Sequence, residues 1–292
     1  MALTAGSFIL LFSIALAVSF LASMVGIGGG VLWVPLLVAF FGLSVPEART
    51  ISLFCMIFVT LSATVGYFKY NCIDWKLGMV YDLFAIPGVL MGKWIADLLN
   101  NIFPNILKIM VVSALWILAS LMLARKSKKT DDDEDFYVVR DSFMDEKHHI
   151  QMSKSKKWIF SLISSFFGGF VAGSVGMGGG TVYTATMILL GLTPIIAVAT
   201  AEFSMIFTNT FGFLTAAILP LINWNIPGFG AESVPILWEF IIPMGIASLI
   251  GAFLGTILSR RVKGSILKKI LAGIAILMGI PIILDILGLW AF

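Results

Sequence analysis

VGIGGG at residues 25–30 returns as VGMGGG at residues 175–180, each time between apolar runs of a chain that is 59% hydrophobic. Glycine runs interrupt helices, because glycine loses much backbone entropy on ordering and readily adopts positive φ. Non-helical backbone at membrane depth is tolerated only where protein buries it or water reaches it, since lipid cannot satisfy its polar groups. If the chain lies in a membrane, the repeated hexapeptide predicts two broken helices around one central cavity.

The composition places the chain in a membrane. Only 12% of its 292 residues are charged, and its mean hydropathy is +1.03, which is too apolar for a soluble domain. Apolar stretches of the length that crosses a bilayer recur along the whole chain. No Lys or Arg precedes Arg49, so the first stretch lacks the basic region of a signal peptide and is expected to be retained. The sequence predicts an all-α polytopic membrane protein.

Apolar runs and their breakers predict about ten segments in two sets of five. The segments are 7–25, 30–43, 50–69, 77–99, 105–124, 158–175, 181–192, 198–222, 236–258 and 266–289. Residues 1–124 then form an N-terminal membrane repeat and residues 158–292 a C-terminal one. Residues 125–157 between them are rich in charge, contain the acidic run DDDED and both histidines, and predict a solvated linker.

The two halves resemble each other beyond the glycines. GLSVPEARTISLF aligns with GLTPIIAVATAEF, and the IPGVLMGKWIADLL segment aligns with IPMGIASLIGAFLGTIL. Because each half has an odd number of crossings, the halves lie upside down relative to each other, and an inverted repeat is typical of transporters. The odd number also survives if the first two segments of each half form a re-entrant hairpin.

The distribution of Lys and Arg predicts the orientation, since short cytoplasmic loops carry the excess. With the linker in the cytoplasm and ten crossings, Lys69, Lys76 and the cluster at 260–269 lie inside, while Arg49 and Lys108 lie outside. Both termini are then outside the cell. If the first pairs are re-entrant hairpins, we expect the termini on the cytoplasmic side instead.

The glycine motifs predict an anion site. The helix that follows each motif presents unpaired N–H groups and the positive end of its dipole, which stabilise an anion without a buried lysine. The expected substrate-binding glycines are Gly26, Gly28, Gly29, Gly30, Gly176, Gly178, Gly179 and Gly180. The alternative is that these glycines only let helices pack closely.

The ordered motifs resemble the TauE/SafE family of sulfite exporters over nearly the whole chain. The similarity rests on the first G-x-GGG with Pro35 and Leu36, a stretch ending at Thr50, and the second G-x-GGG followed by GLTP and by AVAT ending at Thr200. This resemblance implies secondary transport of small sulfur-containing anions such as sulfite, sulfoacetate or related organosulfonates, commonly as export and coupled to protons. Members of the family that resemble thiosulfate importers rely on cysteines near the motifs. In this chain the nearest cysteine is Cys55, and the matching neighbourhood of the second half has Met205, which argues against a relay of thiols.

Polar residues within apolar segments complete the candidate site, because such residues are costly in a membrane. Glu202 and Asp82 are candidates for proton coupling; alternatively, Thr200 or Ser204 hydrogen-bonds the carboxyl of Glu202 for packing alone. Thr50 and Thr200 are candidate substrate hydroxyls, because the repeat places them at matching positions.

The basic residues of the first half leave two alternatives open. Arg49 is either a bidentate ligand of a sulfonate or the mark of an external loop, which its neighbours Pro46 and Glu47 slightly favour. Lys93 and Asp97, four residues apart, are expected to pair within one helix, with the lysine snorkelling toward the interface; the alternative is that they contact the substrate.

The inverted repeat and the family resemblance together imply a secondary exporter of a small sulfur-containing anion, moved by alternating access across the cytoplasmic membrane. Its expected partners are the anion, the lipid bilayer and protons, with no nucleic acid. No cofactor, metal site or enzymatic activity is expected, because the segments lack histidines, a catalytic acid pair and a cysteine pair. The alternatives are an uncoupled anion channel and a transporter for thiosulfate or sulfate uptake.

Overall fold

The computed structural model describes residues 5–26, 28–103, 105–124, 154–217, 237–259, 273, 276–277 and 279–289. Its helices are α1 (Ala5–Val25), α2 (Gly30–Phe41), α3 (Val45–Phe68), α4 (Trp75–Ile102), α5 (Ile106–Ala124), α6 (Lys154–Val175), α7 (Gly180–Leu189), α8 (Pro194–Ala217) and α9 (Trp238–Leu258). Further helical residues lie between 279 and 286. The described part of the chain contains no strand, which confirms the all-α prediction.

Six of the described helices are long and apolar enough to cross a bilayer, namely α1, α3, α4, α6, α8 and α9. By contrast, α2 has 12 residues and α7 has 10. At a rise of 1.5 Å per residue these helices reach roughly 15 to 18 Å, about half of the ~30 Å hydrocarbon layer. The prediction of a polytopic membrane protein is confirmed. The helix after each glycine motif is about half as long as a helix that crosses the bilayer.

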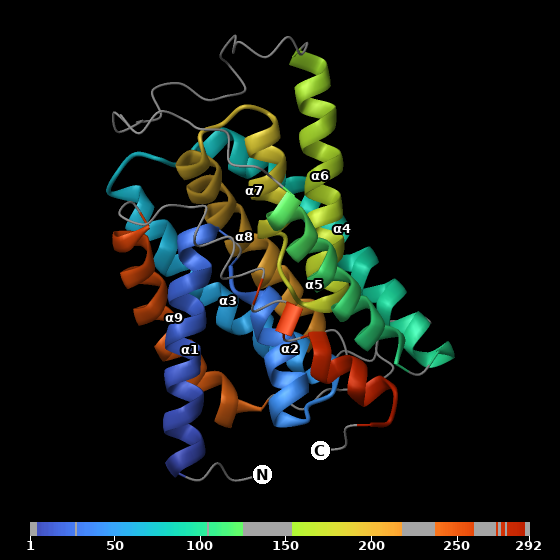
Figure 1. Ribbon diagram of the computed structural model, residues 1–292. Coiled ribbons are helices and arrows are strands. Elements are labelled where there is room, and N and C mark those ends of the chain that lie inside the picture. Colours follow the sequence, from blue (N-terminus) through green and yellow to red (C-terminus); the bar gives the residue numbers. More distant parts are fainter. Residues whose placement is uncertain are drawn as a thin grey trace.

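The two broken segments enter from opposite ends of the molecule. In Figure 1, α1 begins at the lower end and α6 at the upper end, and both end near the middle, where α2 and α7 turn back. The prediction that re-entrant hairpins would bring the start of the chain to the side of the linker is therefore wrong. A re-entrant hairpin begins and ends on the same side of the membrane. An odd number of crossings therefore still separates the start of α1 from the start of α6.

Helix packing follows a pseudo-two-fold pattern. α3 contacts α8, its counterpart in the other half. α4 lies along α6, and their counterparts α9 and α1 lie along each other in the same way. Likewise, α8 contacts α4, and the corresponding helix α3 contacts α9. The short helices repeat the pattern, because α2 packs on α3 as α7 packs on α8. The first helix of each half thus packs mainly against the other half, so the two sequence repeats are intertwined.

Close helix contacts give the register of the repeat. A methyl group at Gly88 would lie 2.2 Å from the carbonyl oxygen of Phe166, and one at Gly251 would lie 2.4 Å from that of Leu16. These two glycines are 163 positions apart, whereas the Ile-Pro pairs of α4 and α9 are 156 apart. The alignment of α4 with α9 by those Ile-Pro pairs is therefore wrong by about two helical turns.

Local sequence determines where helices begin. The Ser44 side chain and the Glu47 carboxylate form a reciprocal capping box at the start of α3, and the Asp74 carboxylate accepts from the Leu77 N–H at the start of α4. α6 begins at Lys154, so the last four residues of the predicted linker are helical. The rest of the linker, with its histidines, lies outside the described residues, as do residues 223–235 between the eighth and ninth predicted segments.

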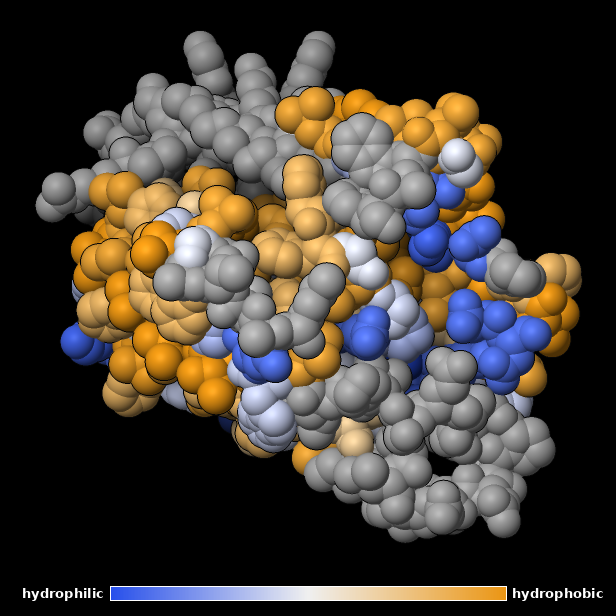
Figure 2. All heavy atoms as spheres, turned by 90° about the horizontal axis from the view of Figure 1, so that it is seen from below, coloured by the Kyte–Doolittle hydropathy of each residue, from blue (hydrophilic) through white to orange (hydrophobic). Residues whose placement is uncertain are grey.

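The outer surface is apolar. Figure 2 shows orange over most of the described surface that is visible from below, with blue residues gathered in restricted areas. Exposed side chains such as Leu83 on α4, Ile117 on α5 and Phe167 on α6 are more than half accessible. This surface suits lipid, because exposed apolar side chains cost nothing in hydrocarbon.

Candidate functional site

The two glycine motifs meet at the centre of the fold. Methyl groups at Gly28 and Gly178 would lie 2.9 and 2.1 Å from one atom, the Cε of Met56, so the two positions are at most 5.0 Å apart. A methyl group at Gly30 would lie 2.7 Å from the Met177 carbonyl oxygen. The motifs therefore form one junction between α1, α2, α6 and α7, which we call the glycine junction (residues 26, 28–30 and 176–180).

The backbone of the junction needs glycine. Positive φ angles occur at Gly26, Gly28, Gly29, Gly176 and Gly178, a region that other residues rarely adopt. These turns let α2 begin at Gly30 and α7 at Gly180, so that two helix N-termini start at the junction. The broken helices predicted from VGIGGG and VGMGGG are confirmed.

Methionines fill the space beside the glycines. A methyl group at Gly28 would lie 2.8 Å from the Met205 Sδ, and one at Gly30 would lie 2.3 Å from the Met56 Sδ. Met56 and Met205 are fully buried, and they occupy corresponding places on α3 and α8. In this conformation the glycines therefore provide close packing, which is the alternative that the sequence left open.

Two hydroxyls bind the carbonyl groups of the motifs. Thr184 Oγ1 donates to the Gly26 carbonyl oxygen at 2.9 Å, and Ser52 Oγ donates to that of Gly176 at 2.9 Å. Sequence reasoning missed both residues, because a serine or threonine in an apolar segment carries no signal of the backbone that it faces.

Glu202 on α8 has a fully buried carboxyl group. Neither oxygen has a partner of good hydrogen-bond geometry within the described residues, although the backbone N–H of Gly28 points toward the carboxyl group. Ser204 Oγ donates to the Gly78 and Thr200 carbonyl oxygens. The alternative in which Thr200 or Ser204 hydrogen-bonds this carboxyl is therefore wrong, and within the described part of the chain the acid stands beside the first motif without a counter-ion.

Asp82 on α4 is 8% exposed, and both of its carboxyl oxygens lack a hydrogen-bond partner among the described residues. Its carboxyl group is close enough to interact electrostatically with Tyr183. The ring of Tyr183 packs against Gly179, and its hydroxyl lies 3.2 Å from Thr208 Oγ1. The second motif thus also has an acid nearby, contributed by the other half of the chain.

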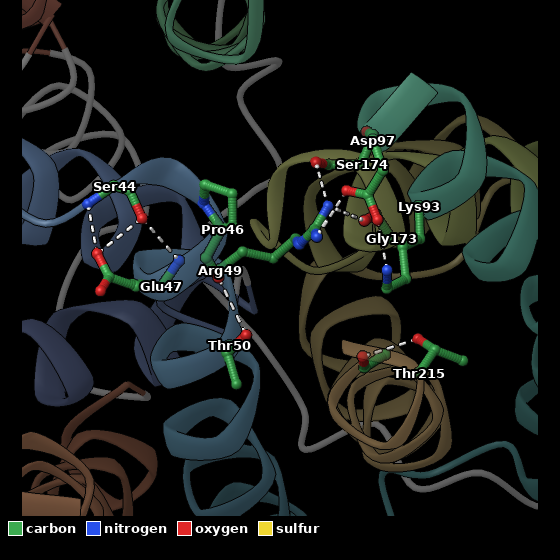
Figure 3. A network of polar contacts seen from close by, with 11 residues as sticks. Ser44, Pro46, Glu47, Arg49, Thr50, Lys93, Asp97, Gly173, Ser174 and Thr215 are labelled. Carbon is green, nitrogen blue, oxygen red and sulfur yellow. Dashed lines mark hydrogen bonds and ion pairs between the residues drawn. The ribbon is translucent and has the colours of Figure 1, made fainter. Parts of the chain in front are cut away.

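Arg49 lies on α3 and is 3% exposed, so its interpretation as the mark of an external loop is wrong. Its guanidinium donates to Asp97 Oδ1 at 2.9 Å and to the carbonyl oxygens of Gly173 and Ser174 at 3.4 and 3.3 Å, as Figure 3 shows. It therefore joins α3 to α4 and to the C-terminal end of α6, where a cation is favourable.

Lys93 and Asp97 form the predicted ion pair within α4. Lys93 is only 4% exposed, so it does not snorkel away from the protein as expected. Together with Arg49, these residues form a buried cluster of two cations and one carboxylate, next to the end of α6 that leads into the second motif.

The threonines predicted as substrate ligands have partners within the protein. Thr50 Oγ1 donates to the Pro46 carbonyl oxygen, and Thr200 Oγ1 accepts from the Asp74 N–H at 3.0 Å. Their expected equivalence is wrong by one residue. The Cα atoms that face Gly176 and Gly26 belong to Arg49 and Val198, so corresponding positions of α3 and α8 are 149 residues apart. Thr50 and Thr200 are 150 residues apart.

The described residues contain no group of three or more His, Cys, Asp or Glu side chains that could hold a metal ion. Cys55 and Cys72 are both buried and unbonded to each other. Cys55 lies next to Met56 on α3, and burial keeps its thiol away from solvent.

Comparison with known proteins identifies the family of this chain. Residues 11–282 match the family described as Sulfite exporter TauE/SafE. The chain is also 27% identical over 288 residues to the protein named "Probable membrane transporter protein YunE" of Bacillus subtilis (strain 168), covering 96% of this chain and 98% of that protein. No solved structure shows significant similarity. The chain belongs to the TauE/SafE sulfite exporter family of membrane transporters.

Proposed function

We propose that the protein exports a small sulfur-containing anion, such as sulfite, sulfoacetate or a related organosulfonate, across the cytoplasmic membrane by proton-coupled alternating access. The observation that carries this proposal is the glycine junction, where two helix N-termini meet beside the unpartnered carboxyl of Glu202. Family membership supports the class of substrate. The protein acts as a carrier and performs no chemistry on the anion.

The charge of Glu202 supplies the coupling. An isolated ionised carboxylate in an apolar interior is costly, and it would repel an anion at the junction about as strongly as a nearby cation would attract it. The anion therefore binds when Glu202 carries a proton, and the proton travels with the anion. Asp82, near the second motif, is the alternative coupling acid. Net flux follows the combined gradients, so the anion is exported where its own outward gradient exceeds any opposing proton gradient.

The intertwined halves support alternating access. Their corresponding helix pairs are related by the pseudo-two-fold pattern, so two nearly equivalent packings are available around one central junction. Met56 and Met205 close the junction in this conformation. With the charged linker in the cytoplasm, as the distribution of Lys and Arg indicates, the anion passes from the linker side to the opposite side.

Efflux from preloaded proteoliposomes tests this function. Purified protein is reconstituted, and efflux of sulfite, sulfoacetate, thiosulfate, sulfate and chloride is compared with protein-free vesicles. Efflux of sulfite or sulfoacetate that saturates with concentration and exceeds chloride efflux supports the exporter. Fast chloride flux that does not saturate would favour the uncoupled channel, and preference for thiosulfate or sulfate would favour the uptake transporter.

A further inference from the structure

The glycine junction contains two buried hydrogen-bond donors that the architecture leaves unpaired. Within the described residues, the indole N–H of Trp33 and the amide group of Asn209 have no hydrogen-bond partner, and both side chains are fully buried. Leaving such a group unpaired costs about 1–3 kcal/mol, so native proteins rarely keep one without a reason. Here the reason must act at the junction, because both donors lie beside its glycines.

Trp33 on α2 lies against the first motif. Its Nε1 would be 3.1 Å from a methyl group at Gly29. The corresponding ring in the second half is Tyr183, which packs against Gly179 in the same way and whose hydroxyl pairs with Thr208. The residue that corresponds to Thr208, 149 positions earlier, is Val59, which cannot accept a hydrogen bond. The first half has thus replaced a paired aromatic group by an unpaired donor.

Asn209 on α8 lies against the second motif. Its Oδ1 would be 3.5 Å from a methyl group at Gly178, and a half-turn of the amide places Nδ2 at the same point. Its counterpart in the first half is Thr60, whose hydroxyl donates to the Met56 carbonyl oxygen within α3 at 2.8 Å. The second half has thus replaced an internally satisfied hydroxyl by an unpaired amide.

The two donors come from opposite halves, and each lies beside one of the two motifs that meet at the junction. Gly29 follows Gly28, and the positions beside Gly28 and Gly178 are at most 5.0 Å apart, with the Met56 methyl group between them. Methionine is flexible and readily repacks, so its side chain can vacate this position. What remains is a pair of neutral donors, one beside each motif, at the junction where a thioether now lies.

We propose that the Trp33 indole N–H and the Asn209 amide N–H₂ donate hydrogen bonds directly to the transported anion, which takes the place of the Met56 side chain at the glycine junction. This inference rests on the proposed function and names its ligands. An oxyanion whose oxygens diverge from one sulfur atom, as in sulfite or a sulfonate, meets both donors at once. Neutral donors orient such an anion without the strong attraction of a buried lysine, which lets the anion leave again.

Binding to purified variants tests the proposal. Affinities of sulfite and sulfoacetate are measured by calorimetry for the wild type, Trp33→Phe, Asn209→Leu and the double variant. Because hydrogen bonds to charged groups contribute about 1.5–3 kcal/mol, each single change should weaken binding about tenfold or more, and the double change by roughly the product. Thr60→Val and Trp116→Phe, which alter an internally bonded hydroxyl and an exposed indole, should leave affinity unchanged.

Unchanged affinity in the folded single variants would overturn this inference and leave the proposed function standing. Absence of any sulfite or sulfoacetate binding by the wild type would overturn both. Should a variant fail to fold, the wild type labelled with ¹⁵N in its tryptophan indoles gives a second readout among its eight tryptophans. A sulfite-dependent downfield shift of one indole N–H signal is expected, and eight unmoved signals during demonstrated binding would overturn the proposal.

Discussion

The buried side chains of Arg49 and Glu202 differ in whether the protein supplies partners for their charge. Arg49 has an ion pair and two carbonyl acceptors, so its charge is fixed by structure. Glu202 is equally buried, but its carboxyl oxygens have no partner in the described part of the chain. A carboxyl group without a partner in the described structure is free to change its protonation when an anion approaches.

Glu202→Gln should make anion binding independent of pH. In the wild type, affinity should fall as pH rises, because ionisation of Glu202 introduces a negative charge beside the anion. Glutamine has nearly the same shape and stays neutral, so the variant should bind at every pH as the wild type does at low pH. Calorimetric titrations with a sulfonate, whose own charge is constant, measure this; Glu239→Gln, on the exposed first turn of α9, is the matched control. An unaltered pH dependence in Glu202→Gln would exclude Glu202 from coupling.

Gly30→Ala should destabilise the protein by about 1–3 kcal/mol, the usual cost of overpacking a tight site. Its added methyl group would lie 2.3 Å from the Met56 Sδ and 2.7 Å from the Met177 backbone, and the backbone cannot move aside as a side chain can. Thermal denaturation in detergent measures the change. Gly6→Ala, where no atom lies within 4 Å of the new methyl group, should have little effect; equal melting temperatures for both variants would show that the contact at Gly30 is looser than described.

Helices in this fold are held together by small residues and a few polar links. Gly88, Gly92, Gly169 and Gly173 allow α4 and α6 to touch through their backbones. Ser19 and Ser23 of α1 take the places of Gly169 and Gly173 and hydrogen-bond to Ser248 and to the Ala252 carbonyl oxygen of α9. Both helix pairs therefore pack closely, through Gly88 and Gly92 in one pair and Gly251 and Gly255 in the other, and the α1–α9 pair adds hydroxyl bonds at the two positions where α6 has glycine.

Asp97→Asn should destabilise the protein by about 3–5 kcal/mol, because it removes the carboxylate that accompanies two buried cations, Arg49 and Lys93. Asp285→Asn is the matched control: its partner Lys108 lies 2.6 Å away, but both side chains are about 30% exposed, so a loss of only about 0–1 kcal/mol is expected. Denaturation of the two variants is compared side by side. Equal losses would contradict the assignment of the Arg49 cluster as a buried link between α3, α4 and α6.

The sequence predicted helices well and their contacts poorly. Hydropathy and the glycine motifs sufficed for the ends of α2, α4 and α7 to within a few residues, because lipid imposes length and composition on each segment. The register between the two halves could not be predicted in this way. The alignment of α4 with α9 by their Ile-Pro pairs takes no account of which face of α9 packs against α1. The partners of Arg49 escaped prediction for a related reason: they lie 48 and 124 or more residues away, on α4 and α6.

At the scale of the whole molecule, the two halves form one intertwined body. α1 packs on α9 and α6 on α4, so neither half can move without shifting helices of the other. The glycine junction lies where the two entering hairpins meet, and any change that opens it toward one end of the molecule alters both halves together. The sequence contained the repeat, but the exchange of hairpins depends on long-range packing that no local pattern encodes.

Concentrative transport in proteoliposomes tests the central claim, that the glycine junction carries an anion together with a proton, most directly. With a pH gradient imposed and equal sulfite on both sides, wild-type protein should accumulate radiolabelled sulfite in the less acidic compartment, and a protonophore should abolish the accumulation. Glu202→Gln should retain exchange of sulfite while losing accumulation. Wild-type flux that only dissipates sulfite gradients, whatever the imposed pH difference, would contradict coupling and leave an anion channel.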